Sequence, residues 1–105
     1  MQDYKIELLP PAWRELDEIA DMHLSLVGAK SAEKITNAIL DAIDNLKKSP
    51  YMGRVVNEPM LVNEGYRKLI CGNYLCFYKV LGQTVYIYHI ADGRRNYPKM
   101  FEEMK

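Results

Sequence analysis

The stretch of sequence that decides the fold is YRKLICGNYLCFYKVLGQTVYIYHIA, residues 66–91. It contains three segments rich in Tyr, Val, Ile, Leu and Phe, the residue types that favour strands: 66–71, 74–81 and 84–91. The breaks between them, Gly72-Asn73 and Gly82-Gln83, are two residues long and suit tight hairpin turns. The stretch therefore predicts a three-stranded antiparallel meander.

The N-terminal part of the chain predicts a strand and a first helix. Residues 4–9 begin by alternating apolar and polar side chains, as a half-buried strand does. Pro10 and Pro11 follow, and proline ends a strand and can open a helix. From Trp13 the apolar residues recur every three or four positions until Gly28, which is the period of one helical face. His23 lies on that face, where we expect a half-buried ring with its hydrogen bonds satisfied.

A second helix follows after a short break. Its apolar stripe runs from Ala32 to Leu46 with the same period, and Ser31 stands where a helix cap is expected. Pro50 ends the pattern. Because so few residues separate the two stripes, we expect the helices to fold back as an antiparallel hairpin.

The remaining segments complete an α+β fold. Residues 51–65 are rich in Pro, Gly and Asn, so we expect a loop with a short strand near Met60 to Val62. Asp92-Gly93 ends the sheet, and Pro98 can open a short C-terminal helix through Met104. The predicted architecture is one domain, residues 1–105, with the N-terminal strand and helix hairpin packed on a twisted antiparallel meander sheet.

The two hairpins also predict which side chains share a face of the sheet. With two-residue loops, Lys68 lies opposite Phe77 and Phe77 lies opposite Tyr88. The face expected to meet the helices carries Arg67, Leu69, Cys71, Cys76, Tyr78, Val80, Val85, Ile87 and His89. The other face carries Tyr66, Lys68, Ile70, Leu75, Phe77, Lys79, Tyr86 and Tyr88. That second face joins aromatic rings to positive charge, which is what stacking on RNA bases beside a phosphate chain requires.

The charges are balanced overall but not along the chain. Fourteen Lys plus Arg match fourteen Asp plus Glu, so the total charge gives no sign of a polyanionic partner. Residues 1–49 hold six basic and nine acidic residues, a net of −3, whereas residues 50–105 hold eight and five, a net of +3. An anionic ligand is therefore expected on the C-terminal half, with chance unevenness in a small protein as the alternative.

Composition narrows the class of protein. The chain has 105 residues, 49% of them apolar, and no apolar run near the ~20 residues that a membrane span needs. We expect no membrane association, no secretory signal and a cytoplasmic location. Cys71 and Cys76 are too few for the disulfide framework of a secreted domain, so we expect reduced, buried thiols.

We expect no metal and no small-molecule cofactor. Cys71, Cys76 and His89 fall on one predicted face, with Cys76 opposite His89, but three such residues without Cys-x-x-Cys spacing are more typical of a core. The sequence also contains no Gly-rich phosphate loop and no Gly-x-Ser-x-Gly.

The cluster with most chemical promise is Asp92-Gly93-Arg94-Arg95-Asn96-Tyr97, directly after the last predicted strand. Guanidinium groups bind phosphate with two hydrogen bonds and keep their charge. A solvated loop with salt bridges to the acidic first helix is the alternative. Arg67 and Lys68 on the neighbouring strand could extend the basic surface, although Arg67 points toward the helices and could be structural.

The order of these elements and three short motifs resemble the RelE/ParE family of bacterial toxins. The motifs are Gly65-Tyr66-Arg67-Lys68-Leu69, Asn73-Tyr74-Leu75-Cys76-Phe77-Tyr78 and Ile90-Ala91-Asp92-Gly93-Arg94-Arg95. The resemblance covers nearly the whole chain. It implies the toxin of a type II toxin-antitoxin system, with a cognate antitoxin protein as its partner.

Within that family the resemblance implies two activities. RelE-like members cut messenger RNA on the ribosome without a metal, and ParE-like members inhibit DNA gyrase without nuclease residues. For the nuclease, the family's motifs place catalytic residues at Lys68 and Arg95, with Tyr97 as a substitute donor, because the family's terminal Tyr falls on Phe101. A further family Arg falls on Leu75.

We therefore predict ribosome-dependent cleavage of messenger RNA. The expected RNA contacts are Arg67, Arg94, Tyr86 and Tyr88. A gyrase inhibitor is the first alternative, and a binding module that only holds a partner protein is the second.

Overall fold

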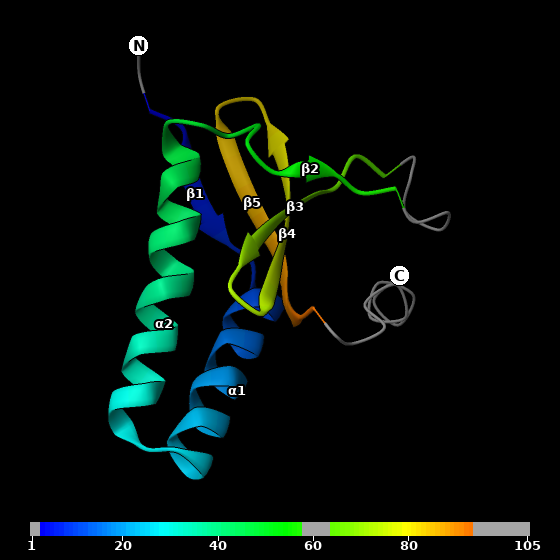
Figure 1. Cartoon of the computed structure of the whole chain (residues 1–105). Coiled ribbons are helices and arrows are strands. Elements are labelled where there is room, and N and C mark those ends of the chain that lie inside the picture. The colour runs from blue at the N-terminus through cyan, green and yellow to red at the C-terminus, as the bar shows by residue number, and fades with distance from the viewer. Residues whose placement is uncertain (1–2, 58–63, 94–105) are drawn as a thin grey trace.

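The computed structural model describes residues 3–57 and 64–93. In chain order the elements are β1 (Lys5–Leu8), α1 (Pro10–Leu26), α2 (Ala29–Asp44), the short 3-10 helix η1 (Asn45–Lys47), β2 (Arg54–Val55), β3 (Arg67–Cys71), β4 (Tyr74–Leu81) and β5 (Thr84–Asp92). The five strands form one sheet in the order β1-β5-β4-β3-β2. Figure 1 shows the two helices together on one side of this sheet, so the predicted α+β arrangement is confirmed.

The predicted meander is present, and its turns explain why. Gly72 and Gly82 have φ values of 64° and 61°, which glycine adopts without strain. A positive φ at the first central residue is what a type II′ hairpin turn requires. The β3–β4 register pairs Lys68 with Phe77, as predicted.

The outer strands complete a mixed sheet. At one edge β1 runs parallel to β5 and pairs Lys5 with Thr84. At the other edge β2, which the sequence did not predict, pairs Arg54 with Lys68. The strand expected near residues 60–62 and the helix expected over 98–104 lie outside the described residues.

The helix hairpin follows the apolar stripes in the sequence. Pro10 and Pro11 occupy the first two positions of α1, where proline has no hydrogen bond to lose. The prediction that Ser31 caps the second helix is wrong. Gly28 is the cap residue of α2, and the Ser31 hydroxyl lies 3.0 Å from Nδ1 of His23. The other ring nitrogen of His23 lies 3.2 Å from the Tyr74 hydroxyl, which confirms the half-buried, hydrogen-bonded histidine.

The main core fills the space between the helices and the sheet. Its buried helical residues are Ala12, Leu16, Ile19, Ile39, Ile43 and Leu46, and they meet buried residues of β3, β4 and β5. A second, smaller apolar cluster contains Val56, Phe77 and Ala91. Because Phe77 alternates with Cys76 and Tyr78 of the main core, this cluster lies on the opposite face of β4.

One irregularity changes the predicted pattern of β5. The register between β4 and β5 shifts at Phe77 and Tyr78, so Phe77 lies opposite His89, and the predicted partner Tyr88 is wrong. Cys76 lies opposite Ile90, not opposite the predicted His89, and Ile90 is the residue buried in the main core. One extra residue in a strand moves the following side chains to the other face, so the predicted faces hold up to Tyr88 and fail from His89 onward.

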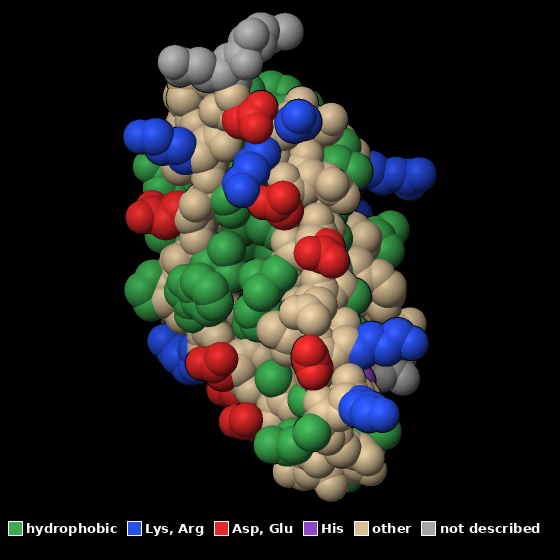
Figure 2. Space-filling view, turned by 90° about the vertical axis from the view of Figure 1, so that its left-hand side faces the viewer, with side chains coloured by type: hydrophobic (Ala, Val, Ile, Leu, Met, Phe, Trp, Pro, Cys, Tyr) green, Lys and Arg blue, Asp and Glu red, His purple; other side chains and the backbone are tan. Residues whose placement is uncertain are grey.

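Figure 2 views the molecule from the side of α2. Hydrophobic side chains gather in the middle of this face, and acidic and basic side chains surround them. No helix within residues 3–57 and 64–93 is long and apolar enough to cross a membrane.

Candidate functional site on the outer sheet face

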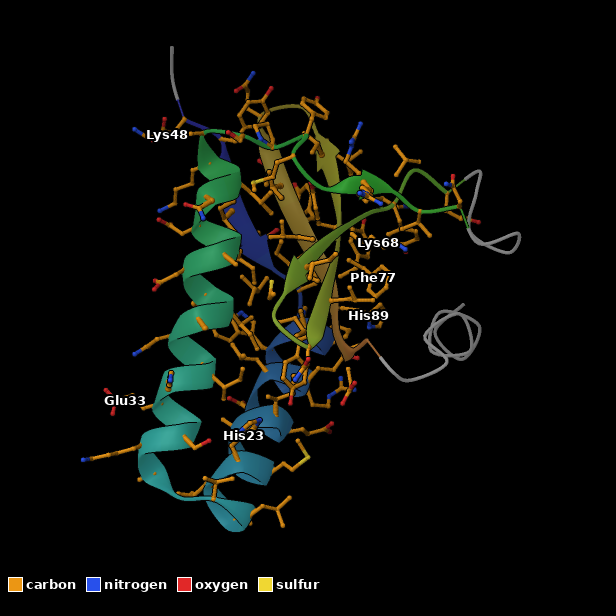
Figure 3. The ribbon with its side chains drawn as sticks, in the orientation of Figure 1. His23, Glu33, Lys48, Lys68, Phe77 and His89 are labelled. Atoms are coloured by element: carbon orange, nitrogen blue, oxygen red, sulfur yellow. The ribbon has the colours of Figure 1, made fainter. Side chains whose placement is uncertain are left out.

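The face of the sheet turned away from the helices, here called the outer face, carries most of the predicted site residues that the structure describes. Figure 3 shows Lys68, Phe77 and His89 on the side of the strands away from α2. Lys68 is half-buried on β3 between Arg54 of β2 and Phe77 of β4. The two basic residues are therefore neighbours on adjacent strands, as an anion-binding surface requires.

Two predicted aromatic residues form a cluster with a lysine. The rings of Tyr66 and Tyr88 meet edge to face with centroids 5.2 Å apart. Nζ of Lys79 lies 4.3 Å from the Tyr66 centroid and 5.2 Å from that of Tyr88, within cation–π range. Burial raises the pKa of Tyr66, and the neighbouring Tyr88 and Glu64 add to the effect. The cluster holds the ammonium charge of Lys79 in a fixed place, and Tyr86 lies opposite that lysine on β5.

The centre of the outer face is apolar. The side chain of Phe77 is fully buried against Val56 and Ala91, and Leu75 and Tyr66 pack against the same cluster. The Phe77 ring, which was expected on the aromatic face, is therefore not available for stacking. Leu75, which stands where the resemblance implies an arginine, contributes a hydrophobic contact to this cluster.

Arg67 holds a loop. Its Nη1 donates hydrogen bonds to the carbonyl oxygens of Gly53, at 2.8 Å, and Tyr51, at 3.3 Å, and its guanidinium lies 5.0 Å from the Tyr51 ring centroid. The amide of Gly53 also donates a 2.8 Å hydrogen bond to the buried hydroxyl of Tyr78. These contacts give Arg67 a structural role, and its contact with RNA stays a prediction.

The basic cluster begins where the described residues end. The amide of Gly93 donates a 2.8 Å hydrogen bond to the carbonyl of Asn73, which holds the end of β5 against the β3–β4 turn. Arg94, Arg95, Tyr97 and Phe101 lie outside the described residues. Their predicted roles in binding or catalysis therefore remain predictions.

Sequence reasoning missed Glu15. Both of its carboxylate oxygens lie 3.1 Å from Nδ1 of His89, and Oε1 accepts a 3.0 Å hydrogen bond from the amide of Ile90. The two side chains are 16% and 4% exposed. Glu15 lies three residues after the buried Ala12 and four before the buried Ile19, so an acid on the apolar stripe was the available signal.

A cavity of about 130 Å³ adjoins this contact. Carboxylates of Glu15 and Glu18 on α1 and of Asp92 on β5 line it, together with apolar side chains that include Met22. Within the described ranges, no group of three or more His, Cys, Asp or Glu residues is arranged to hold a metal ion. The thiols of Cys71 and Cys76 contact each other in the core.

Three solved structures share this fold. A chromosomal ParDE toxin-antitoxin system from P. aeruginosa superimposes with a TM-score of 0.72 at 22% identity, covering 85% of this chain and 95% of that chain. The RelBE2 toxin-antitoxin complex of Mycobacterium tuberculosis gives a TM-score of 0.65 at 18% identity, covering 86% and 98%. A YoeB/ParE toxin from Agrobacterium tumefaciens gives 0.55 at 20% identity, covering 84% and 96%.

Sequence comparison identifies the family. Residues 6–97 match the family model described as the ParE toxin of type II toxin-antitoxin system, parDE. Toxin ParE1 of Mycobacterium tuberculosis is 36% identical over 88 residues, which cover 83% of this chain and 87% of the relative. The chain therefore belongs to the ParE toxin family and is the toxin of a type II toxin-antitoxin system.

Proposed function

We propose that this toxin inhibits DNA gyrase and does not cut messenger RNA. The supporting observation is the apolar cluster at the centre of the outer face. Leu75 packs there with Phe77, Val56 and Ala91, at the position where a nuclease of the wider family carries an arginine. Loss of one group that stabilises transition-state charge typically lowers a rate by ~100-fold to ~1000-fold.

The other outer-face groups also favour binding over proton transfer. Burial raises the pKa of Tyr66, so its hydroxyl stays protonated at neutral pH and cannot serve as a base. His89 is buried against Glu15 and has little access to an RNA backbone. Arginine and tyrosine on this face also suit a protein partner, because both residue types are enriched at protein interfaces.

The partner that restrains the toxin is proposed to be a cognate antitoxin. The ParDE and RelBE2 structures that share this fold are toxin-antitoxin systems by name. An apolar patch of the kind seen on the helical face (Figure 2) often marks a docking surface for another protein. We expect a complex with a Kd in the nanomolar range or tighter, on the order of −12 kcal/mol. Both the antitoxin and gyrase would place the toxin in the cytoplasm.

The test compares the two targets directly. Toxin released from its antitoxin complex is added to a gyrase supercoiling reaction, and separately to messenger RNA with and without ribosomes, followed by primer extension. We expect blocked supercoiling and intact message. New 5′ ends that require ribosomes, with supercoiling unaffected, would overturn the proposal in favour of cleavage by Lys68, Arg95 and Tyr97.

Two variants refine this test. Arg95→Ala removes one charge of the basic cluster after β5. If this cluster contacts the target, toxicity should fall while antitoxin binding persists. Arg14→Ala is the control, because it removes an exposed arginine from α1 and leaves the outer face intact. If neither toxin activity is found and no co-encoded protein binds the chain, only the binding module for some other partner remains.

A further inference from the structure

The two strands at one edge of the sheet differ in length. β1 has four residues and β5 has nine, and the last β1–β5 pair is Leu8 with Ile87. The amide of Leu9 still donates to the carbonyl of Ile87 at 3.0 Å, and the chain then turns into α1 at Pro10. From Tyr88 onward, β5 therefore lies beside α1 without a strand neighbour on that side.

A carboxylate of α1 supplies the hydrogen-bond acceptor that a neighbouring strand would otherwise provide. Glu15 Oε1 accepts the hydrogen bond of the Ile90 amide at 3.0 Å, which is the role of a backbone carbonyl in a sheet. The same carboxylate engages Nδ1 of His89. An ionised acceptor makes a stronger hydrogen bond than a neutral carbonyl does.

The helix that carries Glu15 is firmly anchored. Ala12, Leu16 and Ile19 of α1 are all buried in the main core. On the other side of β5, the Asn73 carbonyl holds the Gly93 amide. The last residues of β5 are thus held from both sides, immediately before Arg94 and Arg95.

We propose that Glu15 is a positioning residue of the toxin: by bonding to Ile90 and His89 it fixes the end of β5, which directly precedes the arginine pair in the sequence. Only the identity of the target rests on the proposed function. The other acidic groups facing this site are Glu18 from α1 and Asp92 from β5, which line the same cavity.

The test uses three variants at Glu15 and two control variants at Glu18. Glu15→Gln keeps an oxygen at the same reach for the Ile90 amide. Glu15→Asp shortens the side chain by one methylene, and Glu15→Ala removes the acceptor. Glu18 is an exposed residue of α1 that lines the same cavity. Glu18→Gln removes a charge from the cavity as Glu15→Gln does, and Glu18→Ala is the control for the truncation in Glu15→Ala.

The first measurement is amide hydrogen exchange. We expect Glu15→Ala and Glu15→Asp to speed exchange of the Ile90 amide by on the order of 10-fold to 100-fold, the effect of losing one hydrogen bond to a charged group. Val85 and Ile87, which pair with β1, should change little. Glu15→Gln should restore most of the protection, and both Glu18 variants should match the wild type.

The second measurement is target inhibition beside antitoxin affinity. The Glu15→Ala and Glu15→Asp toxins should inhibit the target only at concentrations at least ~10-fold higher than the wild type. The antitoxin affinity and the unfolding midpoint of Glu15→Gln should stay near those of the wild type. Recovery by Gln, which a loss of cavity charge would not produce, is the signature of positioning through the hydrogen bond.

The outcomes separate the two proposals. If the wild type does not inhibit gyrase, growth inhibition in cells replaces that assay and the exchange result stands on its own. Unchanged Ile90 exchange in Glu15→Ala overturns the inference. So does full activity of a folded Glu15→Ala protein, or equal loss in the Glu15 and Glu18 variants. If Glu15→Ala does not fold, failure of Glu15→Gln to differ from Glu15→Asp overturns it.

Discussion

The thiols of Cys71 and Cys76 lie 3.3 Å apart, within hydrogen-bond distance for sulfur, in the core beneath the β3–β4 turn. The hydrogen bond from Cys76 lowers the pKa of Cys71, whereas the same bond and burial raise the pKa of Cys76. We therefore expect the two buried thiols to differ in reactivity.

Slow alkylation of the native protein should label Cys71 before Cys76, because the thiolate is the reactive form. Fragment mass spectra of the peptide from Leu69 to Lys79, which carries both residues, report the order. Cys76→Ala should slow the labelling of Cys71 by removing the hydrogen bond that lowers its pKa. Labelling in urea is the control, and preferential labelling of Cys76 in the native protein would contradict the assignment.

Arg67→Ala should destabilise the protein by about 1–3 kcal/mol. The variant loses two hydrogen bonds from a charged group to the Gly53 and Tyr51 carbonyls and the contact with the Tyr51 ring. Arg67→Lys should recover only part of this, because an ammonium cannot reproduce the planar fork. Urea unfolding measures both. Arg54→Ala, at an exposed position, should stay within about 0.5 kcal/mol of wild type.

Tyr78→Phe should change how stability depends on alkaline pH. Burial raises the pKa of Tyr78, although the Gly53 amide and Arg67 act in the opposite direction. The folded protein therefore holds this proton more tightly than the unfolded chain does. The resulting stability is complete below about pH 10, the ordinary tyrosine pKa, and is lost as the pH rises through the folded pKa.

The variant lacks that titration, so its unfolding free energy should fall less steeply above about pH 10. At neutral pH it should be less stable by about 1–3 kcal/mol, because the Gly53 amide loses its acceptor. Urea titrations at several pH values give both quantities. Parallel pH curves for wild type and variant would show that Tyr78 does not titrate in this way.

Gly53→Ala should be more damaging than Gly65→Ala. A Cβ atom on Gly53 would lie 2.5 Å from the Tyr78 hydroxyl and 2.7 Å from the Lys68 carbonyl, so the loop would have to move. We expect a loss of about 1–3 kcal/mol. A Cβ atom on Gly65 would meet no neighbouring atom, so alanine there is strained only by the positive φ of 81°, which lowers stability by about 1 kcal/mol. Thermal unfolding of the two variants tests the ranking.

Leu75→Arg should not create a nuclease. The new guanidinium would enter the Phe77 cluster, so we expect a stability loss of about 1–3 kcal/mol. Primer extension with ribosomes should show intact message, as for the wild type. Ribosome-dependent cleavage by this variant would instead show that the outer face is a nuclease site weakened at one position.

Much of the fold follows from local signals in the sequence. The helix stripes have the period of a single buried face, and Gly72 and Gly82 supply the positive φ that the two hairpins need. These features depend on residues close in sequence, so they can be read without knowing the rest of the chain. The placement of Lys68 opposite Phe77 follows from the first of these turns.

What could not be predicted depends on contacts between distant residues. Alternation assumes an unbroken register, and nothing local marks the extra residue that moves His89 away from Cys76. The parallel pairing of β1 with β5 has no local signature either. The contact of Glu15 with His89 combines both effects, and the site around it was therefore missed.

The parallel pairing of β1 with β5 also sets the order in which the toxin can be completed. Both helices and the three other strands separate β1 from its strand neighbour in the sequence. A strand whose pairing depends on such a distant segment gains its hydrogen bonds only after the intervening chain has been closed into a loop. During synthesis β1 stays unpaired until β5 has been made, so a nascent chain stopped before Thr84 lacks the finished sheet. The β1–β5 pair is therefore the last strand pairing of the sheet that the chain can form as it is synthesised.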